Sequence, residues 1–291
     1  MTLVLKMSVG GLAAVHRVAA RLEPELRTRF LSAIDRLQGY VDVGALAKAI
    51  EQDDPEAAEA LLHLDDLPAE LRPLVDTVHQ VFHGAGHVAS EELGAALNVT
   101  IRFDLTNPRA VRFAAEHGGA LIREVSEATR NGVRTLIANG IAGGRPPVAT
   151  ARQIRDLVGL TDRQAQAVEN YQAELLEEGR AEAQVERMVS RYGTKLLNQR
   201  AKLIARTETI RASSEGQLET WRQAAGNGLI NPAKTTRRWV ATDDDRTCPI
   251  CLDLDGQTVG FYEPFQSIVG PVMASPVHPG DRCSQVLVIA A

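Results

Sequence analysis

The placement of the cysteines constrains this chain most. The sequence holds three, Cys248, Cys251 and Cys283, and all lie near its C-terminal end. The gap in Cys248-Pro-Ile-Cys251 lets two thiolates of one turn reach a single tetrahedral Zn²⁺, and His278 and Cys283 offer a second pair. The number of cysteines is odd, they are clustered, and the chain begins without a signal-peptide pattern. These features indicate metal ligation rather than disulfide bonds. We therefore predict a zinc site with ligands Cys248, Cys251, His278 and Cys283.

Two other interpretations of these cysteines stay open. A redox CxxC with an idle third thiol is typical of a thioredoxin-like βαβ unit, but no such pattern surrounds Cys248. The remaining alternative is a reduced fold without metal. A set of three cysteines and one histidine fills the four-coordinate preference of zinc and leaves no open position, which favours a structural site.

The rest of the chain is patterned for helices. Hydrophobic residues make up 44% of it and aromatic residues 4%, a balance that favours helices packed through aliphatic side chains. After Trp221 the pattern changes to turns and short β-branched segments, with Asp255-Gly256 suited to a hairpin and Cys283–Ile289 to a terminal strand. We predict a mainly α protein: a helical body followed by a small α+β, zinc-stabilised C-terminal module. Such a module buries too little apolar surface to fold unaided, so the metal would stabilise it.

Capping residues divide the helical part. The apolar pattern over Val43–Leu64 continues the helical region, with Pro55 early in a helix that follows Asp53-Asp54. Thr150 and Thr161 are each placed to cap a helix that begins at the next residue. From these boundaries we predict an N-terminal helical region over residues 1–100, a central helical domain over residues 101–215 and a zinc-knuckle α+β module over residues 216–291.

An ordered series of motifs resembles a known family. The series comprises Leu203-Ile-Ala-Arg-Thr-Glu-Thr-Ile-Arg-Ala212, Arg238-Trp239, Asp245-Arg-Thr-Cys-Pro-Ile-Cys251, Leu254-Asp-Gly-Gln257, Pro264-Phe265 and His278-Pro-Gly-Asp-Arg-Cys283. It resembles the C-terminal domain of Mu F-like phage head-morphogenesis (minor capsid) proteins, and the resemblance covers roughly residues 100–291. The family usually reads His-Pro-x-Cys-Arg-Cys. This chain has Asp281 in place of the first of those cysteines, so Asp281 is a further candidate ligand.

The resemblance implies a function in assembly. Such a minor head protein assists procapsid assembly, associates with the portal protein or the major capsid protein on the inside of the head, and can stay with the packaged DNA. It implies no catalytic set and no small-molecule substrate. We expect a protein made in the host cytoplasm and kept in the virion. The formal net charge of −5 excludes a general nucleic-acid coat. Because no apolar run approaches the ~20 residues that span a bilayer, we expect no membrane partner.

Two alternatives to the assembly function come from the zinc motif. An HNH-like nuclease would need a histidine beside the metal to activate water. The one histidine after residue 216 is His278, which is already predicted to be a zinc ligand. A zinc-containing DNA-binding module would show binding that depends on salt. We therefore expect no enzyme.

Charge is divided between two consecutive segments. Residues 162–186 hold seven acids and two bases, and residues 187–211 hold seven bases and one acid. On one helix, five of these bases fall within about 100° of one another. This basic stripe comprises Arg187, Arg191, Lys195, Lys202 and Arg206. Either the stripe pairs with the acidic helix before it, which we favour, or it faces DNA or an acidic portal surface.

Three smaller groups invite functional interpretations. His79, His83 and His87 are spaced like metal ligands on a helix, but without an HExxH glutamate we expect a solvated or interface face. Asp243-Asp-Asp245 reads as a solvated turn rather than a cation loop. In Arg206-Thr-Glu208 we expect a buried Arg–Glu pair, or a threonine that ties the helix to the zinc module, rather than a catalytic acid.

Overall fold

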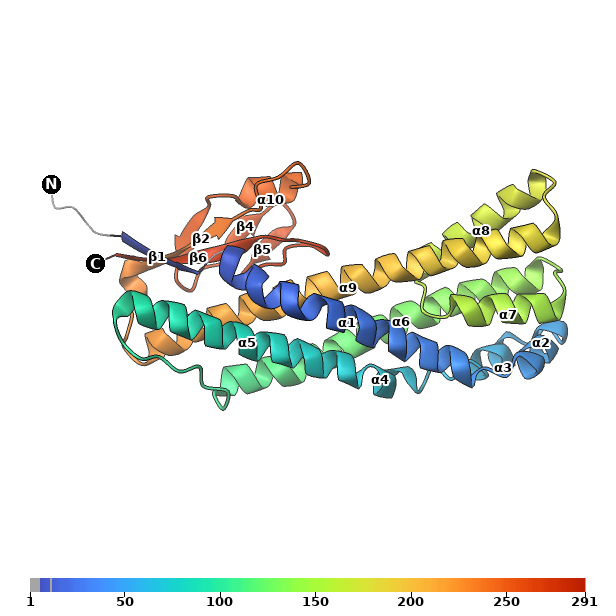
Figure 1. Cartoon of the computed structure of the whole chain (residues 1–291), viewed down its shortest axis with the longest axis horizontal. Helices are drawn as coiled ribbons and strands as arrows, with labels where there is room; N and C mark the ends of the chain where they lie inside the picture. Colours follow the sequence, from blue (N-terminus) through green and yellow to red (C-terminus); the bar gives the residue numbers. More distant parts are fainter. Residues whose placement is uncertain (1–5, 11, 291) are drawn as a thin grey trace. The chain divides into compact units, whose positions relative to one another are not determined.

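Long helices and a small sheet make up the chain. The computed structural model describes residues 6–10 and 12–290 (Figure 1); residues 1–5, which contribute to the expectation of no signal peptide, lie outside them. The helices are α1 (Leu12–Tyr40), α2 (Val43–Glu51), α3 (Pro55–Ala60), α4 (Leu67–Glu70), α5 (Arg72–Leu97), α6 (Pro108–Ala142), α7 (Pro147–Leu157), α8 (Asp162–Glu177), α9 (Glu182–Gly226), η1 (Pro232–Lys234) and α10 (Pro249–Leu254). The strands are β1 (Lys6–Gly10), β2 (Thr235–Val240), β3 (Thr258–Gly260), β4 (Phe265–Ser267), β5 (Gly270–Val272) and β6 (Ser284–Ala290). The prediction of a mainly helical chain with a small C-terminal sheet region is confirmed.

Contacts divide the chain into two compact units built from segments that are distant in sequence. Unit 1 takes the chain up to Leu26, Asp76–His117 and the chain from Leu203 onward. Unit 2 takes Arg27–Val75 and Gly118–Lys202. Several long helices therefore contribute one part to each unit. The division into three consecutive domains stays a prediction.

The sheet of unit 1 joins the two ends of the chain. Its strand order is β1-β6-β2-β3, and all neighbours are antiparallel. β1 pairs with β6 from Lys6↔Ala290 to Gly10↔Val286, so the two strands lie side by side (Figure 1). The predicted terminal strand is confirmed with a shift of one residue, whereas β1 was missed because five residues are too few to show an alternating pattern.

Close helix packing supports the sheet. The ring of Phe82 stacks on Phe113 at a centroid distance of 4.6 Å and meets Phe103 edge-on at 5.5 Å. A Cβ atom on Gly216 would lie 2.4 Å from the Phe82 carbonyl oxygen, so α9 approaches the α5 backbone where only glycine fits. An apolar cluster then joins α5, α9 and the sheet: Leu93, Leu218, Trp221, Ala224, Ile230, Phe261 and Leu287.

Unit 2 is organised around a buried guanidinium. Arg200 of α9 is 6% exposed and donates hydrogen bonds to the Thr129 hydroxyl (3.0 Å) and to the carbonyl oxygens of Val125 (3.1 Å) and Gly159. Its guanidinium lies 5.4 Å from the centroid of the Phe30 ring. Burial lowers the pKa of Arg200 to about 10. One side chain thus ties α9 to α6 and to the turn between α7 and α8.

The local signals for helix ends had mixed success. Pro55 starts α3 as predicted, and Thr161 caps α8 through a capping box with Gln164. The prediction for Thr150 was wrong, because α7 already begins at Pro147, whose fixed φ favours the first helical position. The hairpin at Asp255-Gly256 was also wrong, since the turn follows helix α10 rather than a strand.

Candidate metal centre

Cys248 and Cys251 stand at the start of the short helix α10. Cys248 is the residue before the helix, in extended conformation (φ −79°, ψ 162°), and Pro249 follows at the first helical position. The fixed φ of proline starts the turn, and Cys251 then lies on its inner side, buried against Trp239 and Phe265. Cys248 is half-buried. The sequence therefore builds a knuckle that brings two thiols together.

His278 approaches both thiols from the loop after β5. Its Nε2 lies 3.2 Å from the Cys248 Sγ and 3.3 Å from the Cys251 Sγ. Its Nδ1 lies 2.9 Å from the carbonyl oxygen of Pro279, which can only accept, so Nδ1 carries the proton. In the neutral ring, Nε2 then presents its lone pair to the two thiols, which is the form that binds a metal.

The four predicted ligands lie close together and can hold a metal ion. Two groups, Cys248-Cys251-His278 and Cys251-Asp281-Cys283, each have all ligand atoms within 4.8 Å of one another. Tetrahedral zinc with bonds of about 2.3 Å to sulfur sets the sulfur atoms about 3.8 Å apart, so each group has the size of a metal site. The cavity that they line measures about 30 Å³, which is enough for one ion or water molecule and too small for a substrate.

The Asp281 carboxylate is buried and saturated with hydrogen bonds. It is 1% exposed. Its Oδ1 accepts from the backbone N–H of Cys283 (2.7 Å) and lies 3.6 Å from the Cys251 Sγ. Its Oδ2 accepts from the N–H of Val277 (2.8 Å) and from the Ser275 hydroxyl (3.1 Å). Since these donors occupy both oxygens, the carboxylate fixes the shape of the loop that carries His278 and Cys283.

The protein environment affects the thiols differently. Burial raises the pKa of Cys283 to about 12, and the charge of Asp281 adds to the effect. Burial and then the Asp281 charge also raise the pKa of Cys251. For Cys248, burial acts to raise the pKa, but hydrogen bonds from Cys251 and the charge of His278 outweigh it and lower the pKa overall. A bound divalent cation would displace the protons of the two buried thiols.

The ligand loop is tied to α9 by a threonine, as the sequence predicted. The N–H of Gly280 donates to the Thr207 hydroxyl at 3.0 Å. The neighbouring charges do not pair with each other. Glu208 lies 2.6 Å from the Nε2 of His117, and Arg206 bonds Glu23 at 3.1 Å. The threonine interpretation is therefore confirmed. The buried Glu208 also lies 3.7 Å from the Arg211 guanidinium, so an Arg–Glu pair is present, but it lies within α9 and does not tie the helix to the ligand loop.

Asp244 links the two ligand-bearing segments. Both of its oxygens accept from the Arg282 guanidinium, each at 2.6 Å, and these bonds hold the pKa of Asp244 well below its usual range. The prediction of a solvated turn thus holds for the exposed Asp243 and Asp245 but is wrong for Asp244. None of the three acids belongs to a potential metal group among the described residues.

Sequence reasoning missed the structural role of Arg237. This fully buried side chain donates to the carbonyl oxygen of Phe261 and to the Gln285 Oε1, both at 2.9 Å, and also to the carbonyl oxygens of Met273 and Glu263. Burial lowers its pKa to about 10. It holds the connections between β3 and β6 against the sheet. The alternating pattern of β2, which places Arg237 on the buried face of the strand, was the available signal.

The three histidines of α5 do not act together. His79 bonds the carbonyl oxygen of Ala114 at 2.9 Å, whereas His83 and His87 are exposed. The three form no potential metal group in the described part of the chain. The expected solvated face is thus confirmed for His83 and His87, while His79 packs against α6.

The basic stripe is exposed instead of paired with α8. Arg187, Arg191, Lys195 and Lys202 are exposed, and Arg206 is half-buried against Glu23. Among the described residues, no ion pair joins any of the five to a carboxylate of α8. The favoured pairing of stripe and acidic helix is therefore wrong. One cause is that Glu169 of α8 turns instead to Arg145, at 3.0 Å.

The comparison with known protein families decides the class. A family model described as "Phage Mu protein F like protein" matches residues 131–286, which is more than half of the chain. This chain belongs to the phage Mu F-like family. The match includes all four candidate ligands and confirms the resemblance carried by the motifs. No curated protein and no solved structure matches the chain.

Membership in the Mu F-like family gives the broad function. The family is one of phage head-morphogenesis proteins, which belong to the virion or its assembly and interact with other capsid components. It is a structural family and is not known for an enzymatic activity. In the described part of the chain, no helix combines the length and the apolar character needed to cross a bilayer.

Proposed function

We propose that this Mu F-like protein is a minor head protein that assists procapsid assembly by binding the portal protein or the major capsid protein on the inside of the head. The family match over residues 131–286 is the observation that carries the proposal. The four exposed residues of the basic stripe support it, because cations without an ion pair on one helix face suit an acidic protein surface or packaged DNA. The protein is made in the host cytoplasm and remains in the virion as a non-catalytic component.

Coexpression tests this function. The tagged protein is produced together with the portal and major capsid proteins of its own genome, and the assemblies are separated by size. We expect it to copurify with procapsids or with one of the two partners. The matched control replaces both partners with those of an unrelated phage and should leave the protein unbound. A protein that behaves as an inert species beside its own portal and capsid proteins contradicts the proposal.

We also propose that the cluster binds one structural Zn²⁺ through Cys248, Cys251, His278 and Cys283. Three thiols and an imidazole are donors that zinc prefers, and four protein ligands leave no position for a substrate. In this arrangement Asp281 positions the loop without touching the metal. The ion would join the turn of α10 to the loop before β6 and contribute its binding free energy to folding.

Elemental analysis of protein purified without chelator tests the zinc proposal. We expect about one zinc per chain, as a single four-ligand site requires. Cys251→Ser should lose the metal, because the remaining ligands no longer complete the site. His87→Gln, which removes an exposed histidine away from the cluster, is the control and should keep it. Wild-type protein without stoichiometric zinc contradicts the assignment.

The nuclease alternative gains no support from the site. His278 directs Nε2 at two thiols, so it is not free to activate water. The cavity of about 30 Å³ also leaves no room for a phosphodiester.

A further inference from the structure

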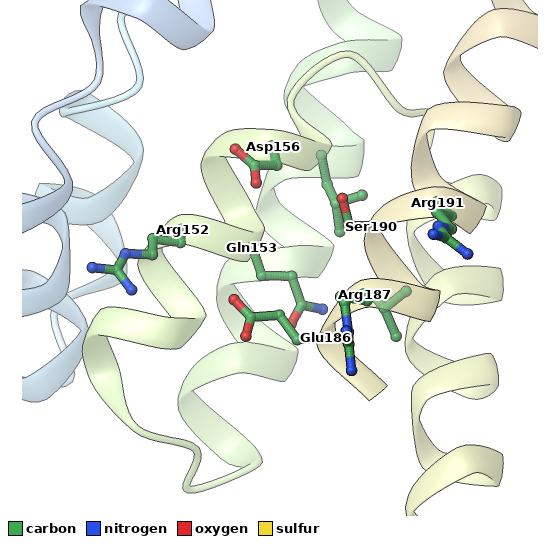
Figure 2. Close-up of a pocket in the computed structure, with 9 residues that line it drawn as sticks. Arg152, Gln153, Asp156, Glu186, Arg187, Ser190 and Arg191 are labelled. Carbon is green, nitrogen blue, oxygen red and sulfur yellow. The ribbon is translucent and has the colours of Figure 1, made fainter. Parts of the chain in front are cut away.

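Unit 2 has a groove between α7 and the first turns of α9 (Figure 2). It encloses about 440 Å³ and is lined by Arg152, Gln153 and Asp156 of α7 and by Glu186, Arg187 and Arg191 of α9. The two helices pack closely at one end of the groove. A Cβ atom on Gly193 would lie 2.1 Å from the Leu157 Cδ2, so the two helices meet there, and the groove lies on the N-terminal side of this contact.

The groove is rich in unpaired positive charge. Arg187 and Arg191 are exposed, and neither forms an ion pair with any other described residue. Of the two carboxylates in the lining, Asp156 is already paired with Arg155 at 2.7 Å. Glu186 is therefore the one carboxylate of the described lining that is not paired with an arginine outside the groove. The groove therefore suits an occupant that brings carboxylates.

The end of α8 carries such carboxylates. Glu174 and Glu177 are exposed and form no ion pair within the described residues, and Leu176 beside them is 46% exposed. We call Glu174, Leu176 and Glu177 the acidic end of α8. A short connection after residue 178 leads from this end into the first turns of α9. The acidic end and the α9 side of the groove therefore belong to one helical hairpin, yet no ion pair between described residues joins them within it.

We propose that two copies of this chain associate through unit 2, with the acidic end of α8 from each copy seated in the α7–α9 groove of the other. A surface that carries both partners of a contact is self-complementary, which is what a two-fold interface requires. Leu176 would pack against the aliphatic stems of Arg187 and Arg191 while Glu174 and Glu177 meet their guanidinium groups. This association does not rest on the portal or capsid binding proposed above, although it would occupy two residues of the basic stripe, Arg187 and Arg191.

Sedimentation of the full-length protein at low and high salt tests the proposal. We expect a dimer at low salt that dissociates as salt screens the charges. The variants R187E/R191E and E174K/E177K should each weaken dimerisation at least about tenfold, because both halves of the interface lose their pairs. Mixing the two variants should restore a heterodimer. In one half the acidic groove of R187E/R191E meets the basic helix end of E174K/E177K, and in the other half the native acidic end meets the native basic groove.

The control is E124K/E127K, which reverses two exposed carboxylates of α6 without described ion pairs and should leave the dimer unchanged. Circular dichroism establishes that each variant is folded. A monomeric wild type overturns the proposal, as does a dimer that the charge reversals do not affect or a mixture that fails to associate. A monomer that binds duplex DNA, and loses this binding in R187E/R191E but not in E174K/E177K, assigns the groove to nucleic acid and likewise overturns it.

Discussion

Two residues of this protein place a full positive charge inside it without a carboxylate partner. Arg200 in unit 2 and Arg237 in unit 1 are satisfied by carbonyl, hydroxyl and amide oxygens. Burial lowers the pKa of both to about 10, so both stay charged at neutral pH. Each guanidinium gathers backbone segments that are far apart in the sequence, a role that its planar set of five donors suits.

Arg200→Met tests this role. The variant keeps the apolar stem but removes the donor of the Gly159 carbonyl oxygen and one of the donors of the Val125 carbonyl oxygen. We therefore expect the free energy of unfolding to fall by about 2–4 kcal/mol. Urea denaturation followed by circular dichroism measures it. Lys195→Met, at an exposed position of the same helix outside the proposed dimer contact, should change stability by less than about 0.5 kcal/mol. Equal effects of the two substitutions would refute the role of Arg200.

Asp281→Ala separates a positioning residue from a metal ligand. Because the carboxylate holds the loop that carries His278 and Cys283, we expect zinc affinity to fall by about 10–100-fold while the stoichiometry stays the same. The cobalt-substituted variant should keep the sulfur-to-metal charge-transfer band of three thiolates. Cys283→Ser should lose part of that band. A change in the ligand-field spectrum of Asp281→Ala at full cobalt occupancy would instead make Asp281 a ligand.

At the scale of elements, the basic stripe of α9 is a solvent-exposed surface for most of its length. The stripe was expected to pair with α8, but its exposed members lack such partners. We therefore expect the variant K195Q/K202Q, which leaves the proposed dimer contact of Arg187 and Arg191 intact, to change the free energy of unfolding by less than about 1 kcal/mol. Chemical denaturation at low salt is the measurement. Arg206 is left intact because it pairs with Glu23. A larger loss of stability would restore the pairing interpretation.

Features that depend on neighbouring residues were easier to predict from the sequence than features that depend on distant ones. Local signals such as Thr161, Pro55 and the apolar terminal strand act within a few residues and were found in the sequence. The candidate ligands form two local pairs, Cys248 with Cys251 and His278 with Cys283, and the donor set that zinc prefers linked the pairs in the sequence. The Thr150 cap and the Asp255-Gly256 hairpin failed although their signals are local. The other failures depend on distant partners: β1 needs β6, and the side-chain partners of Asp244 and of the stripe are set by tertiary packing. Composition and periodicity carry no information about such partners.

At the scale of the whole molecule, the four ligands of the proposed zinc site all belong to unit 1. α9 reaches the ligand loop through Thr207, and the candidate ligands lie after β2 and before β6, two strands that pair with each other. A small module with a metal gains folding free energy from the ligands it fixes. Removal of zinc should therefore loosen unit 1 first. Arg200 and the ion pairs of Glu59 with Arg130 and Arg134 stabilise unit 2 without contribution from the cluster.

Hydrogen exchange after chelation tests this division. In protein treated with a zinc chelator, we expect faster exchange in the α10 turn and in residues 273–290, because their hydrogen bonds depend on the ligand loop. Residues 118–202 should keep the protection of the untreated protein. Cys251→Ser should reproduce the chelator's effect, and His87→Gln should not. Uniform loss of protection across both units would show that the metal supports the whole molecule, and no change anywhere would show that the cluster is not a structural metal site.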